Sequence, residues 1–221
     1  MKRVSLFLGH YGSGKTNIAA NYAIRLRNTG RQVSLADIDI VNPYFRTKDW
    51  KEDFEKAGVE LVALPFANTN LDLPAIPSEV YGLLQRRDRL AVFDIGGDDR
   101  GAYALGRFRP LILEEGDYDM FFVVNFLRPL TRTPQEAIES MREIEAAAGI
   151  GFTGIIHNTN LGAETTPELI ERYAKSAAGL SELSGLPLRF TTVDRELHFS
   201  PAEGTYYGTE GIFPITIKRV I

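Results

Sequence analysis

The feature that most constrains this chain is a glycine-rich segment near its start, Gly9-His-Tyr-Gly-Ser-Gly-Lys-Thr16. It fits the pattern G-x-x-x-x-G-K-[ST], and it lies between an apolar run of strand length, residues 4–8, and a helical pattern over residues 16–28. Glycines in such a segment let backbone N–H groups turn inward around phosphate oxygens, and the helix N-terminus adds partial positive charge. The segment therefore predicts a phosphate-binding loop.

The residue types of this loop predict a site for a nucleoside triphosphate and Mg²⁺. Lys15 would reach the β- and γ-phosphates as the catalytic cation, and Thr16 would place its hydroxyl on the metal. Gly12 and Gly14 would allow the backbone to approach the phosphates closely. The nucleotide contacts expected in and beside the loop are Gly9, His10, Tyr11, Gly12, Ser13, Gly14, Lys15, Thr16 and Asn17.

Strand-length apolar runs alternate with helical patterns along the whole chain. The expected strands are residues 4–8, 33–38, 59–64, 90–95, 120–126, 154–157 and 188–193, and the C-terminal IFPITIKRVI also looks like a strand. The clearest helices are residues 16–28, 78–87, 134–148 and 167–183. This alternation predicts an α/β fold: a mostly parallel sheet of about seven strands, covered by helices on both faces. A length of 221 residues predicts one domain over residues 1–221.

In a parallel sheet of this kind, ligands bind outside the carboxyl ends of the strands. Two loop-rich segments that follow strands, residues 42–50 and 96–110, are expected to be mobile functional loops. Asn125 and Arg128 follow the fifth expected strand and would lie over the same crevice, as the contacts of a second substrate do.

Carboxylates end two of the predicted strands. Asp37 and Asp39 lie at alternate positions at the end of the second strand, so they share one of its faces. Asp94 ends the fourth strand and precedes two glycines, a Walker B pattern in which the carboxylate holds Mg²⁺ through water. Gly96 or Gly97 is expected to donate a backbone N–H to the γ-phosphate, so that loss of this phosphate releases the following loop.

These motifs resemble those of the MinD/ParA-type P-loop ATPases, a group that includes the nitrogenase iron protein, arsenite-pump ATPases and dethiobiotin synthetase. The resemblance implies that Asp37 supports the water shell of the metal and that Asp39, in the first switch, orients the attacking water. It also implies that Asn158, at the end of the sixth strand, reads the purine edge. An amide donates and accepts hydrogen bonds at once, which suits adenine, and Asn160 is a close competitor for this role.

The expected cofactors are ATP and Mg²⁺. The guanine-reading pattern Asn-Lys-x-Asp does not occur in the chain, which favours ATP over GTP. The loop departs from the family in one respect: MinD/ParA-type loops usually read G-K-G-G-x-G-K-[ST], and His10 stands where the first lysine would reach the phosphates of a partner subunit. The sequence leaves open whether a nucleotide-sandwich dimer forms.

Three functions fit these features. The first is a slow ATPase that acts as a nucleotide-dependent switch for a protein partner or within a homodimer. The second is a synthetase or kinase of the dethiobiotin-synthetase type, which transfers the γ-phosphate to a small carboxylate. The third is a nucleotide-binding regulator that does not hydrolyse its ligand.

Composition excludes other classes of function. The net charge of −4, without a run of like charges, argues against nucleic-acid binding. The chain has no cysteine, which removes disulfides, thiolate catalysis and sulfur-ligated metal sites and fits a reducing cytoplasm. No apolar stretch approaches the roughly 18 residues needed to cross a bilayer, so no membrane partner is expected.

Overall fold

The computed structural model describes residues 1–38, 48–63, 78–97 and 99–218. Its eight strands form one sheet in the order β3-β2-β4-β1-β5-β6-β7-β8, and each neighbouring pair is parallel. The strands are β1 (Val4–Leu8), β2 (Val33–Ile38), β3 (Glu60–Ala63), β4 (Leu90–Ile95), β5 (Tyr118–Val124), β6 (Gly154–His157), β7 (Leu188–Asp194) and β8 (Ile212–Ile215). The prediction of a mostly parallel α/β fold is confirmed, with the C-terminal strand as the eighth.

Seven α-helices connect or follow these strands in the described part of the chain. They are α1 (Lys15–Arg27), α2 (Lys51–Ala57), α3 (Ser78–Gln85), α4 (Asp99–Gly106), α5 (Arg109–Glu115), α6 (Pro134–Ala148) and α7 (Pro167–Ser184), and single 3₁₀ turns span Lys48–Trp50 and Gly162–Glu164. None of the helices in these ranges is both long enough and apolar enough to cross a bilayer.

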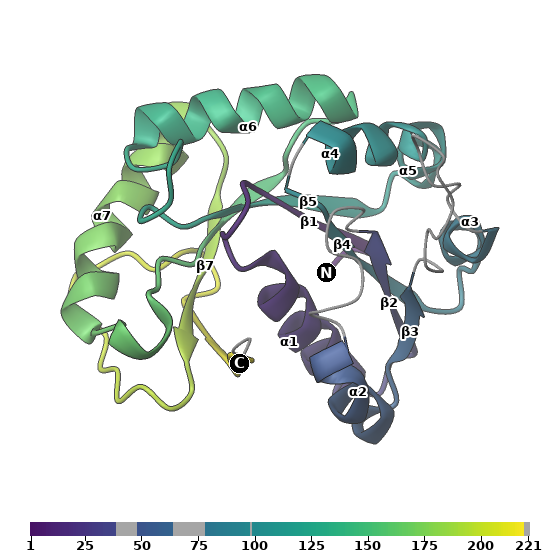
Figure 1. Cartoon of the computed structure of the whole chain (residues 1–221), viewed down its shortest axis with the longest axis horizontal. Helices are drawn as coiled ribbons and strands as arrows, with labels where there is room; N and C mark the ends of the chain where they lie inside the picture. Colours follow the sequence, from purple (N-terminus) through teal and green to yellow (C-terminus); the bar gives the residue numbers. More distant parts are fainter. Residues whose placement is uncertain (39–47, 64–77, 98, 219–221) are drawn as a thin grey trace.

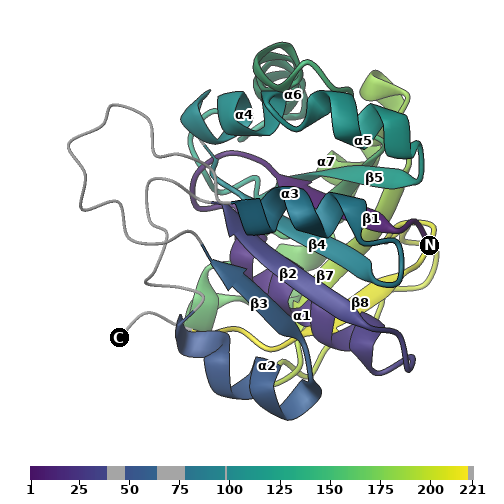
Figure 2. The same ribbon diagram turned by 90° about the vertical axis from the view of Figure 1, so that its right-hand side faces the viewer.

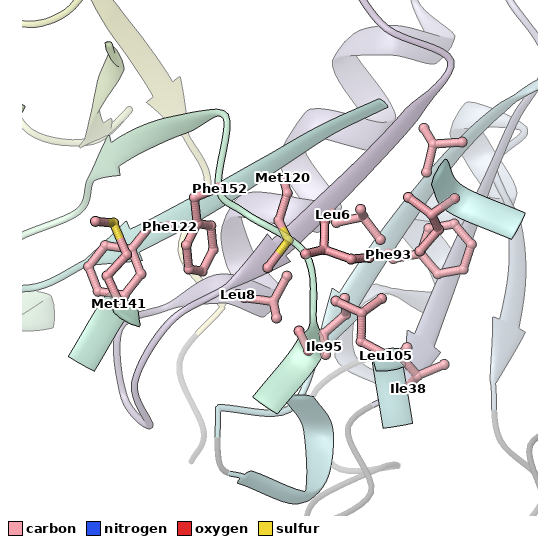
Figure 3. Packing of buried hydrophobic residues seen from close by; sticks show 14 of the residues in the cluster. Leu6, Leu8, Ile38, Phe93, Ile95, Leu105, Met120, Phe122, Met141 and Phe152 are labelled. Carbon is pink, nitrogen blue, oxygen red and sulfur yellow. The ribbon is translucent and has the colours of Figure 1, made fainter. Parts of the chain in front are cut away.

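Helices cover both faces of the sheet, as the continuous apolar strands require (Figures 1 and 2). Helices α1 and α2 lie on one face, and α3 to α7 lie on the other. Side chains alternate along each strand, so in β1 Leu6 and Leu8 pack on the side of α3 to α7, whereas Phe7 packs on the side of α1. Figure 3 shows the hydrophobic cluster between the sheet and helices α3 to α7. Its labelled residues are Leu6, Leu8, Ile38, Phe93, Ile95, Leu105, Met120, Phe122, Met141 and Phe152.

The ends of α6 and α7 follow directly from the local sequence. Each helix starts with proline at its first position, where no N–H is needed, and the hydroxyl of the preceding Thr133 or Thr166 accepts a backbone hydrogen bond from the first turn. Each helix ends at a glycine in the left-handed conformation, Gly149 or Gly185. The predicted bounds 134–148 are therefore exact, and 167–183 is one residue short.

The prediction of a loop over residues 96–110 is wrong. The structure forms α4 there and begins α5 at Arg109. Ala102 and Leu105, three residues apart on one face of α4, are buried, and α4 packs against α6. Gly101 serves packing within this segment, because a Cβ there would lie 2.4 Å from the carbonyl oxygen of Gly96.

Candidate functional site

The phosphate-binding loop lies at the carboxyl edge of the sheet. It connects the end of β1 to the start of α1, and β1 is paired with β4 on one side and β5 on the other. Because all strands are parallel, the ends of β2, β4 and β6, which carry the predicted polar residues, reach the same edge. The topology therefore brings the separate sequence motifs to one place.

The loop is tightly folded around Lys15. The backbone N–H of Ser13 donates to the carbonyl of His10 at 3.1 Å, and the Lys15 ammonium donates to the same carbonyl at 3.4 Å. Lys15 is only 6% exposed although it opens a helix. Gly14, the residue before α1, adopts φ 91°, and a Cβ there would lie 2.2 Å from the amide nitrogen of Asn158. Only glycine fits this position.

Gly97 lies directly against the loop. A Cβ added to it would meet the carbonyl oxygen of Gly9 and the nitrogen of Lys15 at 2.6 Å each, and the backbone nitrogen of Tyr11 at 2.9 Å. The chain that leaves β4 is thus in contact with the phosphate-binding loop and with its lysine. Helix α4 begins two residues later, so this contact connects the loop to a helix.

The carboxylates of Asp37 and Asp94 are neighbours on adjacent strands. The two residues are register partners in the β2–β4 pair, and each is only 2% exposed. Asp37 lies two residues after Leu35, and Asp94 two residues after Val92, so each shares the face of these apolar residues. Leu35 and Val92 pack with α1. Both carboxylates therefore belong to the side of the sheet on which the loop's helix lies, whereas Asp39 lies outside the described residues.

The oxygen groups at this edge fit Mg²⁺ held together with phosphates. Mg²⁺ usually keeps several waters and binds one or two carboxylates plus substrate phosphates, rather than an all-protein cage. Thr16, Asp37 and Asp94 offer one hydroxyl and two carboxylates, all buried. Across the residues that the structure describes, no group of three or more histidine, aspartate or glutamate side chains could hold a metal by itself. The set matches a shared metal–phosphate site.

A cavity of about 180 Å³ opens beside the loop. This volume is below the roughly 300–1,000 Å³ of a complete ligand pocket, so the cavity suits one end of a ligand whose other end lies on the loop. Its walls come from the loop, from the β5–α6 and β6–α7 connections and from the C-terminal segment. The lining residues are Gly12, Gly14, Thr16, Asn17, Asp49, Trp50, Arg128, Asn158, Asn160, Ile215, Ile217 and Lys218.

Asn158 is buried against the phosphate-binding loop. Its amide nitrogen donates to the carbonyl of Ser13 at 2.6 Å, and its amide oxygen accepts hydrogen bonds from the hydroxyl of Thr192 and the amide of Asn160. These bonds hold the loop to β6 and β7, a bracing role that sequence interpretation missed because it joins residues 145 positions apart. Purine recognition by Asn158 or Asn160 stays a prediction, and both residues line the cavity.

Arg128 braces the loop from the other side. Its Nε donates to the carbonyl of Gly12 at 3.1 Å, and the amide of Asn125 donates to the carbonyl of Asn160 at 3.1 Å. The connections after β5 and β6 are therefore tied to each other and to the loop. The sequence placed Asn125 and Arg128 over the crevice, but it gave no signal for these backbone contacts.

His10, Tyr11 and Asn17 are more exposed than Lys15. Tyr11 is 57% exposed, and His10 is partly exposed with its Nδ1 3.1 Å from the carbonyl oxygen of Tyr11. Asn17 faces the C-terminal segment, where it forms hydrogen bonds to the backbone of Lys218. The nucleotide contacts predicted for these three residues stay predictions.

Comparison with known proteins gives a partial match to one curated protein and a set of solved structures with a similar fold. No family model matches the chain. It is 28% identical over 206 residues to the signal recognition particle protein of Mycobacterium leprae (strain TN), a match that covers 88% of this chain and 35% of that protein. The chain thus spans about a third of the curated relative's length.

Solved structures of FtsY have the same fold. Cell division protein FtsY from Thermotoga maritima superimposes with a TM-score of 0.56 at 19% identity, covering 87% of this chain and 62% of that one. Chloroplast FtsY from Physcomitrella patens gives 0.60 at 16% identity, over 86% and 58%. The signal recognition particle receptor FtsY from Elizabethkingia anophelis, solved in complex with GDP, gives 0.54 at 15% identity, over 87% and 58%.

Fold and loop together define the class: the chain has the α/β fold of the P-loop nucleotide-binding proteins, with the phosphate-binding loop between β1 and α1. The fold-class prediction is confirmed. The similar proteins above are a signal recognition particle protein and FtsY, so they support this broad class and not specifically the MinD/ParA-type ATPases that the motifs resemble.

Proposed function

We propose that this chain binds a nucleoside triphosphate with Mg²⁺ and acts as a slow ATPase whose nucleotide state is recognised by a protein partner. The observation that carries the proposal is the close packing of Gly97 on the phosphate-binding loop, within reach of Lys15 and the backbone of Tyr11. A segment that touches both the loop and its lysine is suited to sense whether the terminal phosphate is present.

The buried charges and the Thr16 hydroxyl at this edge each have a role in this proposal. The Lys15 ammonium and the N-terminus of α1 attract the phosphates, and the Thr16 hydroxyl and the carboxylates of Asp37 and Asp94 hold the metal directly or through water. Bound Mg²⁺ supplies positive charge that offsets the developing negative charge on the transferred phosphoryl group. Asp39, which the resemblance assigns to the attacking water, belongs to the same proposal.

The switch acts through α4. Gly97 and α4 are separated by a single residue, and α4 packs on α6 on the opposite face of the sheet from α1. A change in the hydrogen bonding of Gly97 on loss of the γ-phosphate would therefore move a helix on that face. The exposed Tyr103 of α4 gives a partner an aromatic contact there.

Adenine is the base that we propose for the cavity. Asn158 and Asn160 both line it, and the Asn158 amide hydrogen that does not bond to the Ser13 carbonyl can donate to a ring nitrogen of adenine. Guanine is the second candidate, because FtsY from Elizabethkingia anophelis was solved in complex with GDP. The amino group of guanine is a donor that a carboxylate accepts well. Among the described residues that line the cavity, Asp49 is the one carboxylate that could accept this hydrogen bond.

Isothermal titration calorimetry with ATP, GTP and ADP, with and without Mg²⁺, tests the proposal. The matched variant is Lys15→Ala, which removes the ammonium from a buried position and should weaken binding about 100-fold, near the upper end of the loss expected for a charge-assisted contact to phosphate. Phosphate release followed in the same samples measures hydrolysis, which should be slow for a switch that lacks its partner.

Mg²⁺-dependent binding that prefers ATP and is lost in Lys15→Ala supports the proposal. A preference for GTP overturns the adenine assignment and leaves the switch standing. Binding without phosphate release under any condition would favour a non-hydrolysing regulator, and release that requires a small carboxylate would favour a kinase. No nucleotide binding at all would refute the function.

A further inference from the structure

The C-terminal segment after β8 has an unusual hydrogen-bonding partner. Strand β8 pairs with β7 as far as Asp194 and Ile215, and the last contact of this ladder is the Arg195 N–H donating to the Ile215 carbonyl at 2.9 Å. Beyond this point, the backbone of Thr216 and of Lys218 forms hydrogen bonds to asparagine side chains of α1. Side chains of helix α1 therefore replace strand β7 as the hydrogen-bonding partners of this segment.

Asn21 and Asn17 each pair with one residue of the C-terminal segment in both directions, and the Asn21 amide also donates to the Asn17 carbonyl of α1 at 2.7 Å. The Asn21 amide donates to the Thr216 carbonyl at 2.8 Å and accepts from the Thr216 N–H at 2.9 Å. The Asn17 amide accepts from the Lys218 N–H at 3.2 Å and donates to the Lys218 carbonyl at 3.4 Å. Each side chain thus acts as the peptide group of an adjacent strand does.

The spacing of the two asparagines along the helix matches the spacing of their two partners along the segment. Asn17 and Asn21 are four residues apart on one helix face, a rise of about 6 Å, and Thr216 and Lys218 are two residues apart in an extended chain, a rise of about 6.6 Å. The helix and the segment run in opposite directions, because Asn17 meets the later residue. Such a ladder fixes both the position and the direction of the segment.

The held segment forms one wall of the cavity beside the phosphate-binding loop. Ile215, Ile217 and Lys218 all line it. The Lys218 ammonium lies 2.7 Å from a carboxylate oxygen of Asp53 and 5.4 Å from the centre of the Trp50 ring, so the wall also contacts α2 and the turn before it. Asn21 itself does not line the cavity, since it sits one helical turn below Asn17.

We infer that Asn17 and Asn21 are positioning residues that shape the nucleoside end of the ligand site by holding residues 216–218 against α1. The inference rests on the proposed nucleotide binding and deepens it. The phosphate end is built by the loop, and the nucleoside end is built by a segment about 200 residues away in sequence that the two asparagines attach to the loop's own helix.

This arrangement separates two parts of the binding energy. Loss of the Asn21 hydrogen bonds releases the cavity wall formed by residues 216–218 and does not alter Lys15 or the phosphate-binding loop. It should therefore weaken the contribution of the base and ribose to the affinity and leave the contribution of the phosphates unchanged. Inorganic tripolyphosphate with Mg²⁺ probes the phosphate end alone, and ATP or GTP, whichever binds the wild-type chain more tightly, probes both ends.

The decisive variant is Asn21→Ala. Thr216 is exposed, so water can replace the lost partner, and we expect the variant to fold with a melting transition close to that of the wild type. Its affinity for the nucleotide should fall about tenfold, as for the loss of two hydrogen bonds, with the affinity for tripolyphosphate unchanged. Asn21→Asp, which keeps the acceptor for the Thr216 N–H but turns an oxygen toward the Thr216 carbonyl, should lose at least as much.

Arg25→Met is the matched control. Arg25 lies one further turn along the same helix, and its guanidinium carbon is 5.0 Å from the ring centre of Phe213 in β8. This variant should bind both ligands as the wild type does. Equal loss of nucleotide and tripolyphosphate in Asn21→Ala, or no loss of either in a folded Asn21→Ala and Asn21→Asp, would overturn the inference.

The test also separates the inference from the function on which it rests. A wild-type chain that binds neither nucleotide nor tripolyphosphate refutes both. A wild-type chain that binds the nucleotide through Lys15, but equally well after either Asn21 substitution, refutes only the role of the asparagines.

Discussion

The two edges of the sheet use buried polar groups in opposite ways. At the amino edge, the Arg3 guanidinium forms an ion pair with Glu115, each side chain being 8% exposed, and donates to the carbonyls of Leu84 at 2.8 Å and Arg86 at 3.0 Å at the end of α3. At the carboxyl edge, Lys15 and the carboxylates of Asp37 and Asp94 are equally buried, but they surround a glycine loop and a cavity.

This difference shows which buried charges serve stability and which serve binding. The Arg3 guanidinium of the amino edge pairs with Glu115 and with carbonyls at the end of α3, so removing it should destabilise the fold. The groups of the carboxyl edge lie where neighbouring atoms leave no space for a side chain: a Cβ at Gly14 would meet the Asn158 amide, and a Cβ at Gly97 would meet the phosphate-binding loop and the Lys15 nitrogen. We expect substitutions at the two edges to separate stability from nucleotide affinity.

The largest expected effect is at the amino edge. Arg3→Met leaves the buried Glu115 carboxylate and three carbonyls of the α3 end without their main partner, so the free energy of unfolding should fall by about 3 kcal/mol. Urea denaturation measures this loss, and calorimetry should give an unchanged nucleotide affinity.

Lys2→Met is the matched control, because Lys2 forms only an exposed pair with Asp117, and it should change stability by less than about 0.5 kcal/mol. Equal stability of the two variants would contradict the role of the buried pair.

The next effect is a pH dependence from the carboxyl edge. His157, at the end of β6, is fully buried, and burial lowers its pKa to about 3. The unfolded chain takes up a proton on this histidine near pH 6.5 and the folded chain does not, so stability is full above that pH and falls steadily as the pH drops toward 3. Between pH 7 and pH 5 the loss should be about 2 kcal/mol.

Urea titrations at pH 7 and pH 5 measure this loss in three chains. His157→Gln should remove about 2 kcal/mol of the pH dependence, and His198→Gln, at an exposed histidine, should keep all of it. If wild type and His157→Gln lose the same free energy between these pH values, the histidine is not held neutral in the folded state.

The smallest expected effect is a difference in nucleotide affinity between alanine substitutions at two glycines, Gly97 and Gly82. Gly97→Ala would force a Cβ to within 2.6 Å of the Lys15 nitrogen and of a loop carbonyl, so nucleotide affinity should fall about tenfold. Gly82→Ala, in α3 on the far side of the sheet from the loop's helix, meets no atom within 4 Å and should leave affinity unchanged while stabilising the fold by about 0.5 kcal/mol. An unaffected Gly97→Ala would remove the observation on which the proposed switch rests.

Much of the fold was predictable because its signals are local. The bounds of α6 need only Thr133, Pro134 and Gly149, and the phosphate-binding loop needs only eight consecutive residues. The error over residues 96–110 arose where tertiary packing outweighed local signals: Gly101 resembles a loop residue in sequence, and it is required because α4 approaches Gly96.

The unpredicted part of the site consists of contacts between distant residues. The bonds of Asn21 to Thr216, of Arg128 to Gly12 and of Asn158 to Ser13 span 195, 116 and 145 positions. They join side chains to backbone atoms, and a backbone atom gives no signal in the sequence. The sequence therefore predicted which residues gather at the carboxyl edge, but not what holds them there.

Amide hydrogen exchange with and without a saturating Mg²⁺–nucleotide complex tests the central claim, that the carboxyl edge is the ligand site and the amino edge is structural. We predict slower exchange in peptides that cover residues 9–17 and 95–97, and unchanged exchange around Arg3 and Glu115, in the wild-type chain and not in Lys15→Ala. Exchange that is unchanged at residues 9–17, or slowed equally at both edges, would contradict the account.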